Sequence, residues 1–319
     1  MATLAATPAR AAKTASQTGD LIARLLALGF AALVLLIAVI LVFALWNGSA
    51  PSRHSLGWSF LFSKNWDPVT EKFGALPFIY GTAMTSLLAL LISVPLGVGA
   101  AVFLSELAPP RLSNALTFLI ELLAAIPSVI YGLLAIFTLV PLMRRYIEPF
   151  LKGTLGFLPF FQGPALGVGV LTASMILAIM TFPFIISVSR EALLAVPRDQ
   201  REAALSLGAT KWESTWDVVI PYARLGIFGS IFLGLARALG ETMAVTMVIG
   251  NDPSIHASLL QPGYSIAAII ANEFTEATGA VYLGALVELG LVLFCLTIVI
   301  NAVARLLIIA TTRKGSGRP

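Results

Sequence analysis

The chain has 319 residues, of which 58% are hydrophobic and only 11% are charged, and its formal net charge is +4. A water-soluble domain carries about 25% charged residues, so this composition excludes a protein whose whole surface faces water. A single cysteine, Cys295, excludes an intrachain disulfide, and two histidines far apart in polar segments give no basis for a metal site. The composition therefore predicts a polytopic membrane protein, whose excess of lysine and arginine is typical of cytoplasmic loops and does not indicate binding to nucleic acid.

Six apolar segments are long enough to cross a bilayer as helices, which takes about 20 residues each. In chain order they are 21–46, 78–104, 115–143, 165–189, 225–249 and 283–309. The first is longer than the apolar core of a cleaved signal peptide, about 7–15 residues, so we expect it to remain as a span. The predicted fold class is all-α, with six transmembrane helices.

The positive charges predict an orientation for these spans. With the N-terminus inside, 13 of the 20 lysines and arginines fall on the inner side and 6 on the outer side, with Arg237 inside a span. This excess predicts that both termini are cytoplasmic. The chain then divides into a cytoplasmic tail (1–20), a first span with an outer loop (21–77), a core of five spans (78–310) and a second cytoplasmic tail (311–319).

Within the spans and outer loops, a few residues predict local structure. Pro95, Pro127 and Pro183 each remove a hydrogen bond inside a helix and are expected to kink it. The last outer segment is apolar around Ile266, which predicts a short interfacial or re-entrant helix that packs against protein.

The longest inner connection, 190–224, is a polar island between two spans. Pro197 is expected to end or bend the fourth span, and a short helix then begins at Arg198 or Asp199. Gly208 is well placed to cap that helix at its C-terminus. A second short helix, 211–219, is expected to stop before Pro221.

The first of these short helices has features of a docking site. Ala203 and Ala204 leave a low profile over which a groove on another protein could close, and Asp199, Arg201 and Glu202 can rim the contact with charge. An ordinary solvated linker explains the same residues equally well.

The island resembles the cytoplasmic signature of ABC importer permeases. That signature reads Glu-Ala-Ala, three residues, Gly, nine residues, Ile, one residue and Leu-Pro, and this chain carries its elements at Glu202, Ala203, Ala204, Gly208, Val218, Ile220 and Pro221. It departs only at the Val and the Ile, which keep the apolar character. Segments 121–132 and 237–246, with Trp66-Asp67-Pro68 and 73–77, are similar to the PstC-type permeases of phosphate importers, and the resemblance covers about residues 21–307.

The resemblance implies a type I ABC importer permease fold in the bacterial cytoplasmic (inner) membrane. It implies a heterodimer with a sister permease of PstA type, two copies of a cytoplasmic ATPase that hold ATP and Mg, and a periplasmic phosphate-binding protein. The residues implied to seat on the ATPase are Arg201, Glu202, Ala203, Ala204, Gly208 and Pro221. The chain itself carries no Gly-x-x-x-x-Gly-Lys-Ser/Thr phosphate loop, so we expect a transport subunit without a cofactor of its own.

Charged residues inside the spans are the candidates for contact with substrate. Arg237 lies near the middle of the fifth predicted span, where an arginine costs about 2.5–3.5 kcal/mol on insertion scales. Its guanidinium offers a fork of donors that matches the oxygens of phosphate. Our hypothesis is that Arg237 faces the translocation path, that Glu241 one helical turn later orients or releases it, and that Thr242 and Thr246 add hydroxyl donors.

Several alternatives stay open at this stage. Arg237 and Glu241 could form a pair that only neutralises itself, or Arg237 could bind the sister permease. Glu121 and Glu288, near predicted span ends, could simply reach interfacial water. The chain could instead carry sulfate, molybdate or phosphonate, or act as a phosphate-sensing subunit. An intramembrane protease is disfavoured, because no histidine lies in a span and no His-Glu-x-x-His motif occurs.

Overall fold

The computed structural model describes residues 9–315, and the side chains of residues 19–306 among them. Residues 1–8 and 316–319, which belong to the two predicted tails, lie outside this described part. Within it the chain is helical and contains no strand. Six of its helices are long and apolar enough to cross a membrane: Gly19–Gly48, Leu76–Leu107, Ser128–Leu155, Val170–Leu194, Lys211–Gly240 and Ala280–Leu306. The predicted fold class is confirmed, although the third and fifth spans begin more than ten residues away from their predicted starts.

The helices of the first half, before the Val170–Leu194 span, are interrupted by π-helical turns, which we label η. They are α1 (Ala9–Gly48), α2 (Ala50–Leu56), α3 (Ser59–Phe62), α4 (Leu76–Val102), η1 (Phe103–Leu107), α5 (Pro110–Ala125), α6 (Ser128–Leu134), η2 (Ala135–Leu139), α7 (Val140–Leu142), η3 (Met143–Ile147) and α8 (Glu148–Leu155), followed by the 3₁₀ turn η4 (Pro159–Phe161). The second half contains α9 (Val170–Leu194), α10 (Arg198–Ser206), α11 (Lys211–Glu213), η5 (Ser214–Val219), α12 (Ile220–Gly240), α13 (Met243–Val248), α14 (Ile266–Glu273) and α15 (Ala280–Gly315).

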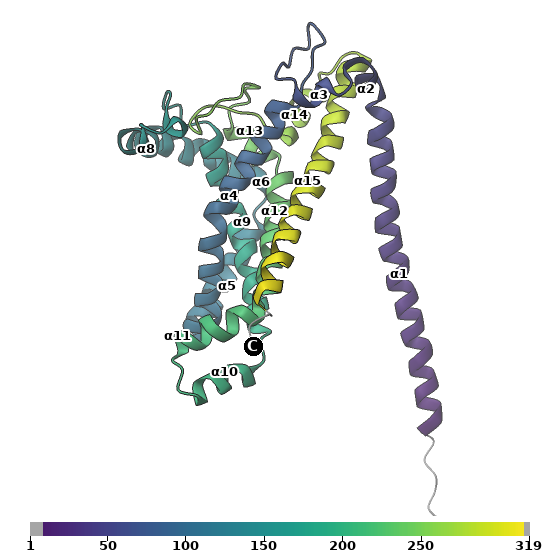
Figure 1. The fold of residues 1–319 in the computed structure, drawn as a ribbon, viewed down its shortest axis with the longest axis vertical. Helices are drawn as coiled ribbons and strands as arrows, with labels where there is room; N and C mark the ends of the chain where they lie inside the picture. The colour runs from purple at the N-terminus through teal and green to yellow at the C-terminus, as the bar shows by residue number, and fades with distance from the viewer. Residues whose placement is uncertain (1–8, 316–319) are drawn as a thin grey trace, which may run out of the picture.

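The long helices form a bundle with two different ends (Figure 1). Helices α10 and α11 lie at one end, which we call the α10 end, and α2, α3 and α14 lie at the other, which we call the α14 end. Helix α1 runs beside the bundle and joins it through α2 at the α14 end, with its apolar side chains exposed. The start of α1 and the end of α15 both point toward the α10 end.

Helices α4, α9 and α12 form the closely packed centre of the bundle. Small residues let these helices approach: an added Cβ on Gly97 would lie 2.8 Å from Ile185 Cγ2. An added Cβ on Gly226 would lie 2.3 Å from the Cβ of Ala192. The buried hydroxyls of Ser189 and Ser230 are 2.7 Å apart and join α9 to α12. These two hydroxyls thus satisfy each other across helices, whereas the buried hydroxyls of Ser86 and Ser93 on α4 have no hydrogen-bond partner within the described residues.

The third predicted span, 115–143, is wrong as a single helix. Helix α5 ends at Ala125, and Ile126 and Pro127 are extended, with ψ angles of 128° and 142°, before α6 begins at Ser128. A residue before proline is disfavoured in the α conformation, and proline supplies no N–H, so the chain changes direction here. Pro95 and Pro183, by contrast, lie inside α4 and α9.

The fifth predicted span, 225–249, is also divided. Helix α12 ends at Gly240, Glu241 is extended with a ψ angle of 126°, and α13 starts at Met243. At the other end of this span, the short helix predicted to stop before Pro221 does not stop there. Pro221 is instead the second residue of α12, where a missing N–H costs no α-helical hydrogen bond, so η5 runs directly into α12.

The last outer segment forms the expected short helix, α14, at the α14 end of the bundle. Its first four residues, Ile266 to Ile269, are buried. The Ser265 hydroxyl accepts from the Ala268 N–H and caps its start. Helix α14 packs against α4, α13 and α15, as a non-spanning helix at membrane depth must do to satisfy its backbone.

Candidate functional site

Helix α10 presents a small exposed surface at the α10 end. It begins after Pro197, as predicted, and ends at Ser206. Gly208 follows with φ of +90° and donates its N–H to the Leu205 carbonyl at 3.0 Å, which confirms its predicted role as the cap. A side chain at this φ would be strained, so the turn after α10 needs glycine.

The exposed side of α10 matches a protein-docking surface in shape and chemistry. Glu202 and Ala203 are exposed and Ala204 is half-buried, which leaves the low profile that the sequence predicts. Leu205 is 47% exposed and Leu207 is 89% exposed. The sequence analysis did not single out these two leucines. Both are apolar side chains on an otherwise polar segment.

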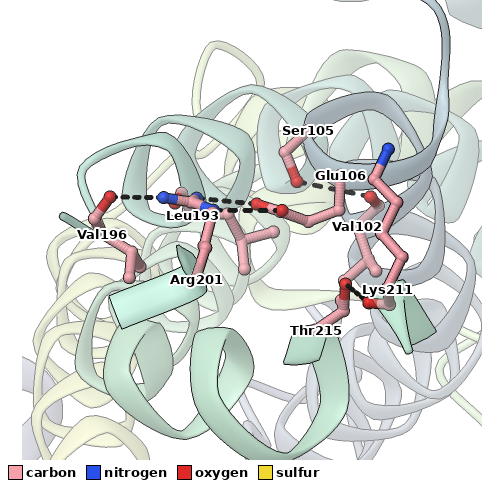
Figure 2. Close-up of polar contacts among 8 residues, drawn as sticks. All are labelled: Val102, Ser105, Glu106, Leu193, Val196, Arg201, Lys211 and Thr215. Carbon is pink, nitrogen blue, oxygen red and sulfur yellow. Dashed lines mark hydrogen bonds and ion pairs between the residues drawn. The ribbon is translucent and has the colours of Figure 1, made fainter. Parts of the chain in front are cut away.

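Arg201 does not rim this surface, although the sequence analysis placed it there. Its guanidinium points inward and contacts Glu106 at the end of α4 (Figure 2). The distances are 2.8 Å from Nη2 to Oε1 and 3.2 Å from Nε to Oε2. Nη2 also donates to the Leu193 carbonyl at 2.8 Å, and Nη1 donates to the Val196 carbonyl. Arg201 therefore anchors α10 to the spans.

The segment after α10 is locked by a second set of contacts. Thr210 and Glu213 form a reciprocal capping box, in which the Glu213 carboxylate accepts from the Thr210 N–H at 2.7 Å. Trp212 and Trp216 stack with ring centroids 5.8 Å apart, and both are exposed. Pro221 is also exposed, near the start of α12. The capping box and the stacked rings thus order the segment after α10.

The two breaks in the spans lie beside each other because α6 packs against α13. An added Cβ on Gly132 would lie 2.4 Å from Met247 Sδ and 3.2 Å from Ala244 Cα, so this approach depends on glycine. The buried Tyr131 donates its hydroxyl to the Leu123 carbonyl at 2.7 Å, across the break after α5. Broken helices at membrane depth are tolerated where they line a cavity or pack on protein, and in transporters they mark substrate sites.

Arg237 lies in the last turn of α12, just before the second break. Its side chain is partly buried, and its guanidinium carbon lies 5.9 Å above the ring of Phe184. Its Nε is buried without a hydrogen-bond partner, and no carboxylate among residues 19–306 lies within ion-pair distance of it. Its two terminal nitrogens also make no hydrogen bond or ion pair within the described residues, and they are therefore the donors available to a ligand or to another chain.

The predicted partnership of Arg237 with Glu241 is not formed, because the helix that would align them ends at Gly240. The Glu241 carboxylate instead accepts from the Ala244 N–H at 3.3 Å, at the start of α13. The Thr246 hydroxyl donates to the Thr242 carbonyl at 2.7 Å, and the Thr242 hydroxyl donates to the Gly240 carbonyl at 3.3 Å. Both hydroxyls donate their only proton within the backbone, so they are acceptors for any further group.

The two acids that the sequence analysis placed near span ends, Glu121 and Glu288, occupy different surroundings. Glu121 is exposed on α5 and lies about one turn before the Ile126–Pro127 break. The sequence analysis expected it near the start of one continuous span, and that position is wrong because α5 ends at Ala125. Glu288 is 6% exposed, in the early part of α15, and accepts the Ser52 hydroxyl at 2.6 Å. Glu288 therefore joins α2 to α15 and does not reach interfacial water.

The first outer loop is held onto the α14 end by one carboxylate. Glu273 Oε2 accepts from Trp66 Nε1 at 2.8 Å and from the Tyr282 hydroxyl at 2.7 Å. Phe73 stacks on Tyr282, with ring centroids 5.1 Å apart. Within the loop, hydrogen bonds from the Thr70 hydroxyl and a backbone N–H hold the pKa of Asp67 below its usual value. The Trp-Asp-Pro segment singled out in the sequence is thus a structural anchor.

Residues 93–311 match the family described as "Binding-protein-dependent transport system inner membrane component". This segment runs from the second half of α4 into α15 and includes α10, both breaks and Arg237. It covers more than half of the chain. The chain belongs to this family. It is therefore a multi-pass inner-membrane protein and a transport subunit, as the sequence predicts.

The similarity to individual relatives extends over nearly the whole chain. The chain is 48% identical over 299 residues to the "Phosphate transport system permease protein PstC" of Xylella fastidiosa (strain Temecula1), covering 92% of each chain. It is 50% identical over 279 residues to the protein of the same name from Mesorhizobium japonicum, covering 86% of this chain and 85% of that one. The match to the Xylella protein covers 92% of this chain, so it extends beyond the family match of residues 93–311.

A solved structure gives the family fold independently. A chain of the MetNI methionine ABC transporter, in an inward-facing conformation, matches with a TM-score of 0.50 at 17% identity. The match covers 72% of this chain and 93% of that one. At this identity the likeness shows the fold alone, and it confirms the predicted type I ABC importer permease architecture.

The sequence analysis did not identify Glu106 as the partner of Arg201. The acid lies just beyond the end of the second predicted span, 95 residues before Arg201, so no local spacing connects the two. The available signal was indirect. A carboxylate followed by Leu-Ala-Pro-Pro at the end of an apolar span is a charge held close to the bilayer, and such charges are normally paired.

Proposed function

We propose that this chain is a permease subunit of an ATP-driven importer that carries inorganic phosphate from a periplasmic binding protein into the cytoplasm. The 48% identity over 92% of both chains to a phosphate transport system permease protein carries the proposal. The PstC-type segments at both breaks and in the first outer loop support the same substrate. No feature of the described residues favours sulfate, molybdate or phosphonate instead.

In this proposal the ATPase is a separate chain, present in two copies that bind ATP and Mg, and α10 seats in a groove on one of them. Glu202, Ala203, Ala204 and Gly208 supply the low, rimmed surface, and the exposed Leu205 and Leu207 add apolar contact. Pro221 fixes the start of the span behind it. The second permease, of PstA type, completes the pore, and the α10 end with both chain termini faces the cytoplasm.

Arg237 is the proposed contact for phosphate in transit. A partly buried guanidinium with unused donors beside two helix breaks suits an anion that must bind briefly and leave. Glu241, Thr242 and Thr246 lie around the same break, where Glu241 holds the start of α13 and the threonine oxygens can accept from a protonated phosphate. Arg237 alone of the four offers donors that are not already used.

Reconstituted transport tests the function as a whole. The chain, its sister permease, the ATPase and the binding protein are placed in liposomes, and ATP-dependent uptake of radiolabelled phosphate is measured with sulfate, molybdate and phosphonates as competitors. We expect phosphate uptake that disappears without ATP or without the binding protein. Uptake of another anion would overturn the substrate, and an assembled complex without uptake would favour a sensing role.

A single substitution tests the role of Arg237. A hydrogen bond to a charged group contributes about 1.5–3 kcal/mol, so Arg237→Gln should lower phosphate uptake roughly tenfold or more in a complex that assembles normally. Arg224→Gln is the matched control, because Arg224 lies on the same helix near its other end and is exposed. Wild-type uptake by the Arg237 variant would place the guanidinium outside the phosphate path.

A further inference from the structure

Arg201 joins three segments that are distant in the sequence. It belongs to α10, its carboxylate partner Glu106 belongs to η1 at the end of α4, and its two carbonyl partners belong to the end of α9. Figure 2 shows these groups converging on one guanidinium. The Arg201 side chain is 20% exposed and that of Glu106 is 8% exposed. This ion pair is therefore shielded from water on both sides, unlike the pair between Arg190 and Glu191, in which the glutamate side chain is 71% exposed.

The chemistry of the contact fixes the direction of α10. A guanidinium presents its donors in a rigid plane, and two of its nitrogens contact both oxygens of Glu106, so the pair resists rotation as well as separation. The carbonyls of Leu193 and Val196 lie at the end of α9, where the Leu193 carbonyl accepts from the Val196 N–H at 3.2 Å but has no donor four residues on, because residue 197 is proline. One side chain thus satisfies the end of α9 and clamps it to the end of α4.

Helix α4 carries this contact to the opposite end of the molecule. Near its start, the Thr82 hydroxyl oxygen accepts from the Ile266 N–H of α14 at 2.9 Å. An added Cβ on the neighbouring Gly81 would lie 2.1 Å from the Tyr264 carbonyl oxygen, so backbone lies against backbone there. Between these ends α4 packs along α9 over its length. The two helices therefore connect α10 directly to α14.

We propose that Glu106 and Arg201 are positioning residues through which a displacement of α10 is passed to α4 and α9, and so to α14 at the other end. The inference rests on the proposed function, in which the ATPase moves α10. Without the link, α10 still docks and ATP is still hydrolysed, but the spans no longer follow α10. The defining loss is therefore in phosphate transported per ATP hydrolysed.

Exchanging the two charges is not a useful test of this link. A carboxylate at position 201 would face the Leu193 and Val196 carbonyl oxygens, which are acceptors, so the reversed pair would be repelled. Neutral substitutions and a conservative one are informative instead. Arg201→Gln and Glu106→Gln each remove the ion pair, and Arg201→Lys keeps the charge but loses the planar fork.

The experiment measures phosphate uptake and ATP hydrolysis in the same reconstituted complexes, together with their melting temperatures. Coupling free energies between sites correspond to about 5–150-fold effects, so each neutral variant should lower the phosphate-per-ATP ratio about fivefold or more. The double variant should be no worse than the more affected single variant, because both remove one interaction. Arg201→Lys should give an intermediate ratio, and Arg198→Gln, an exposed arginine on the same helix, should leave the ratio unchanged.

Two results would overturn the proposal. One is an unchanged ratio in the neutral variants, even with a lowered melting temperature, which would make the pair merely structural. The other is a double variant whose loss is the product of the two single losses, which would make the residues independent. If the wild-type complex carries a different anion, the ratio is measured with that anion, so a wrong substrate overturns the proposed function and leaves this test intact.

Discussion

The carboxylate of Glu273 is expected to control whether the first outer loop stays attached to the α14 end. Two side chains, Trp66 from the loop and Tyr282 from α15, donate to the same oxygen of Glu273. Glu273→Ala removes the shared acceptor and leaves both donors without it. The side chains of Lys64 and Lys72 in this loop are already exposed. Opening of the loop should make the peptide bonds after these two lysines accessible to trypsin.

The magnitude follows from the two hydrogen bonds. A bond to a charged acceptor contributes about 1.5–3 kcal/mol when buried, and both of these bonds are partly buried, so we take about 1 kcal/mol each. A total of about 2 kcal/mol raises the population of the open loop roughly 30-fold. Glu273→Gln keeps an acceptor, but neutral hydrogen bonds are about half as strong, so its effect should be roughly fivefold.

The assay is limited trypsin digestion of the chain in nanodiscs, with cleavage after Lys64 and Lys72 followed by mass spectrometry. When opening and closing are fast, the cleavage rate reports the open population. Glu276→Ala is the matched control, because Glu276 is on the same surface and exposed, and accepts no side-chain hydrogen bond within the described residues. A cleavage rate that Glu273→Ala changes less than about threefold would refute the reasoning.

Two further predictions concern a backbone angle and a buried hydroxyl. Gly208→Ala forces a side chain into a φ of +90°, which costs about 1–2 kcal/mol of stability in the turn after α10. The backbone amides of α10 should therefore exchange hydrogen roughly tenfold faster. Gly99→Ala is the control: Gly99 faces open space at an ordinary φ, so this substitution should leave the exchange rates of α10 unchanged. Unaltered exchange in the first variant would contradict this account of the cap. Ser52→Ala leaves the buried Glu288 carboxylate without its donor at about 1–3 kcal/mol, which should lower the melting temperature by roughly 2–6 °C. Ser55→Ala, whose hydroxyl donates only to nearby backbone carbonyls, should have no effect, and equal melting of the two variants would count against the Ser52 contact.

The spans were predictable because length and apolar character alone decide whether a helix crosses a bilayer. Their breaks were not, because proline gives the same local signal in different surroundings. Pro95 and Pro183 stay inside α4 and α9, whose mutual packing outweighs one lost hydrogen bond. Pro127 interrupts the chain next to α5, which is largely exposed and has fewer contacts to hold it straight.

In the candidate site, too, local features were predictable from the sequence and contacts between distant segments were not. The short helix after Pro197 and its cap at Gly208 are local features, and the sequence predicts both correctly. The expected Arg237–Glu241 pair relied on one continuous helix, and the end of α12 at Gly240 removes that condition. Arg201 was read as a surface charge because its partner lies far away in the chain, and only the fold brings Glu106 to it.

The π-helical turn η5 joins α11 to α12. Such a turn closes its hydrogen bonds over five residues in place of four, so it accommodates one residue more than an α-helix of the same hydrogen-bond count. Deleting one residue from Ser214–Val219 would let the segment become α-helical while α11 kept nearly the same direction, because the wider winding of the π-helical turn already absorbs that residue. Deleting one residue from the α-helical part of α12 would instead rotate everything before it by roughly 100° and shift it by about 1.5 Å. The π-helical turn therefore lets this connection hold one residue more without changing the direction in which Trp212 and α11 face.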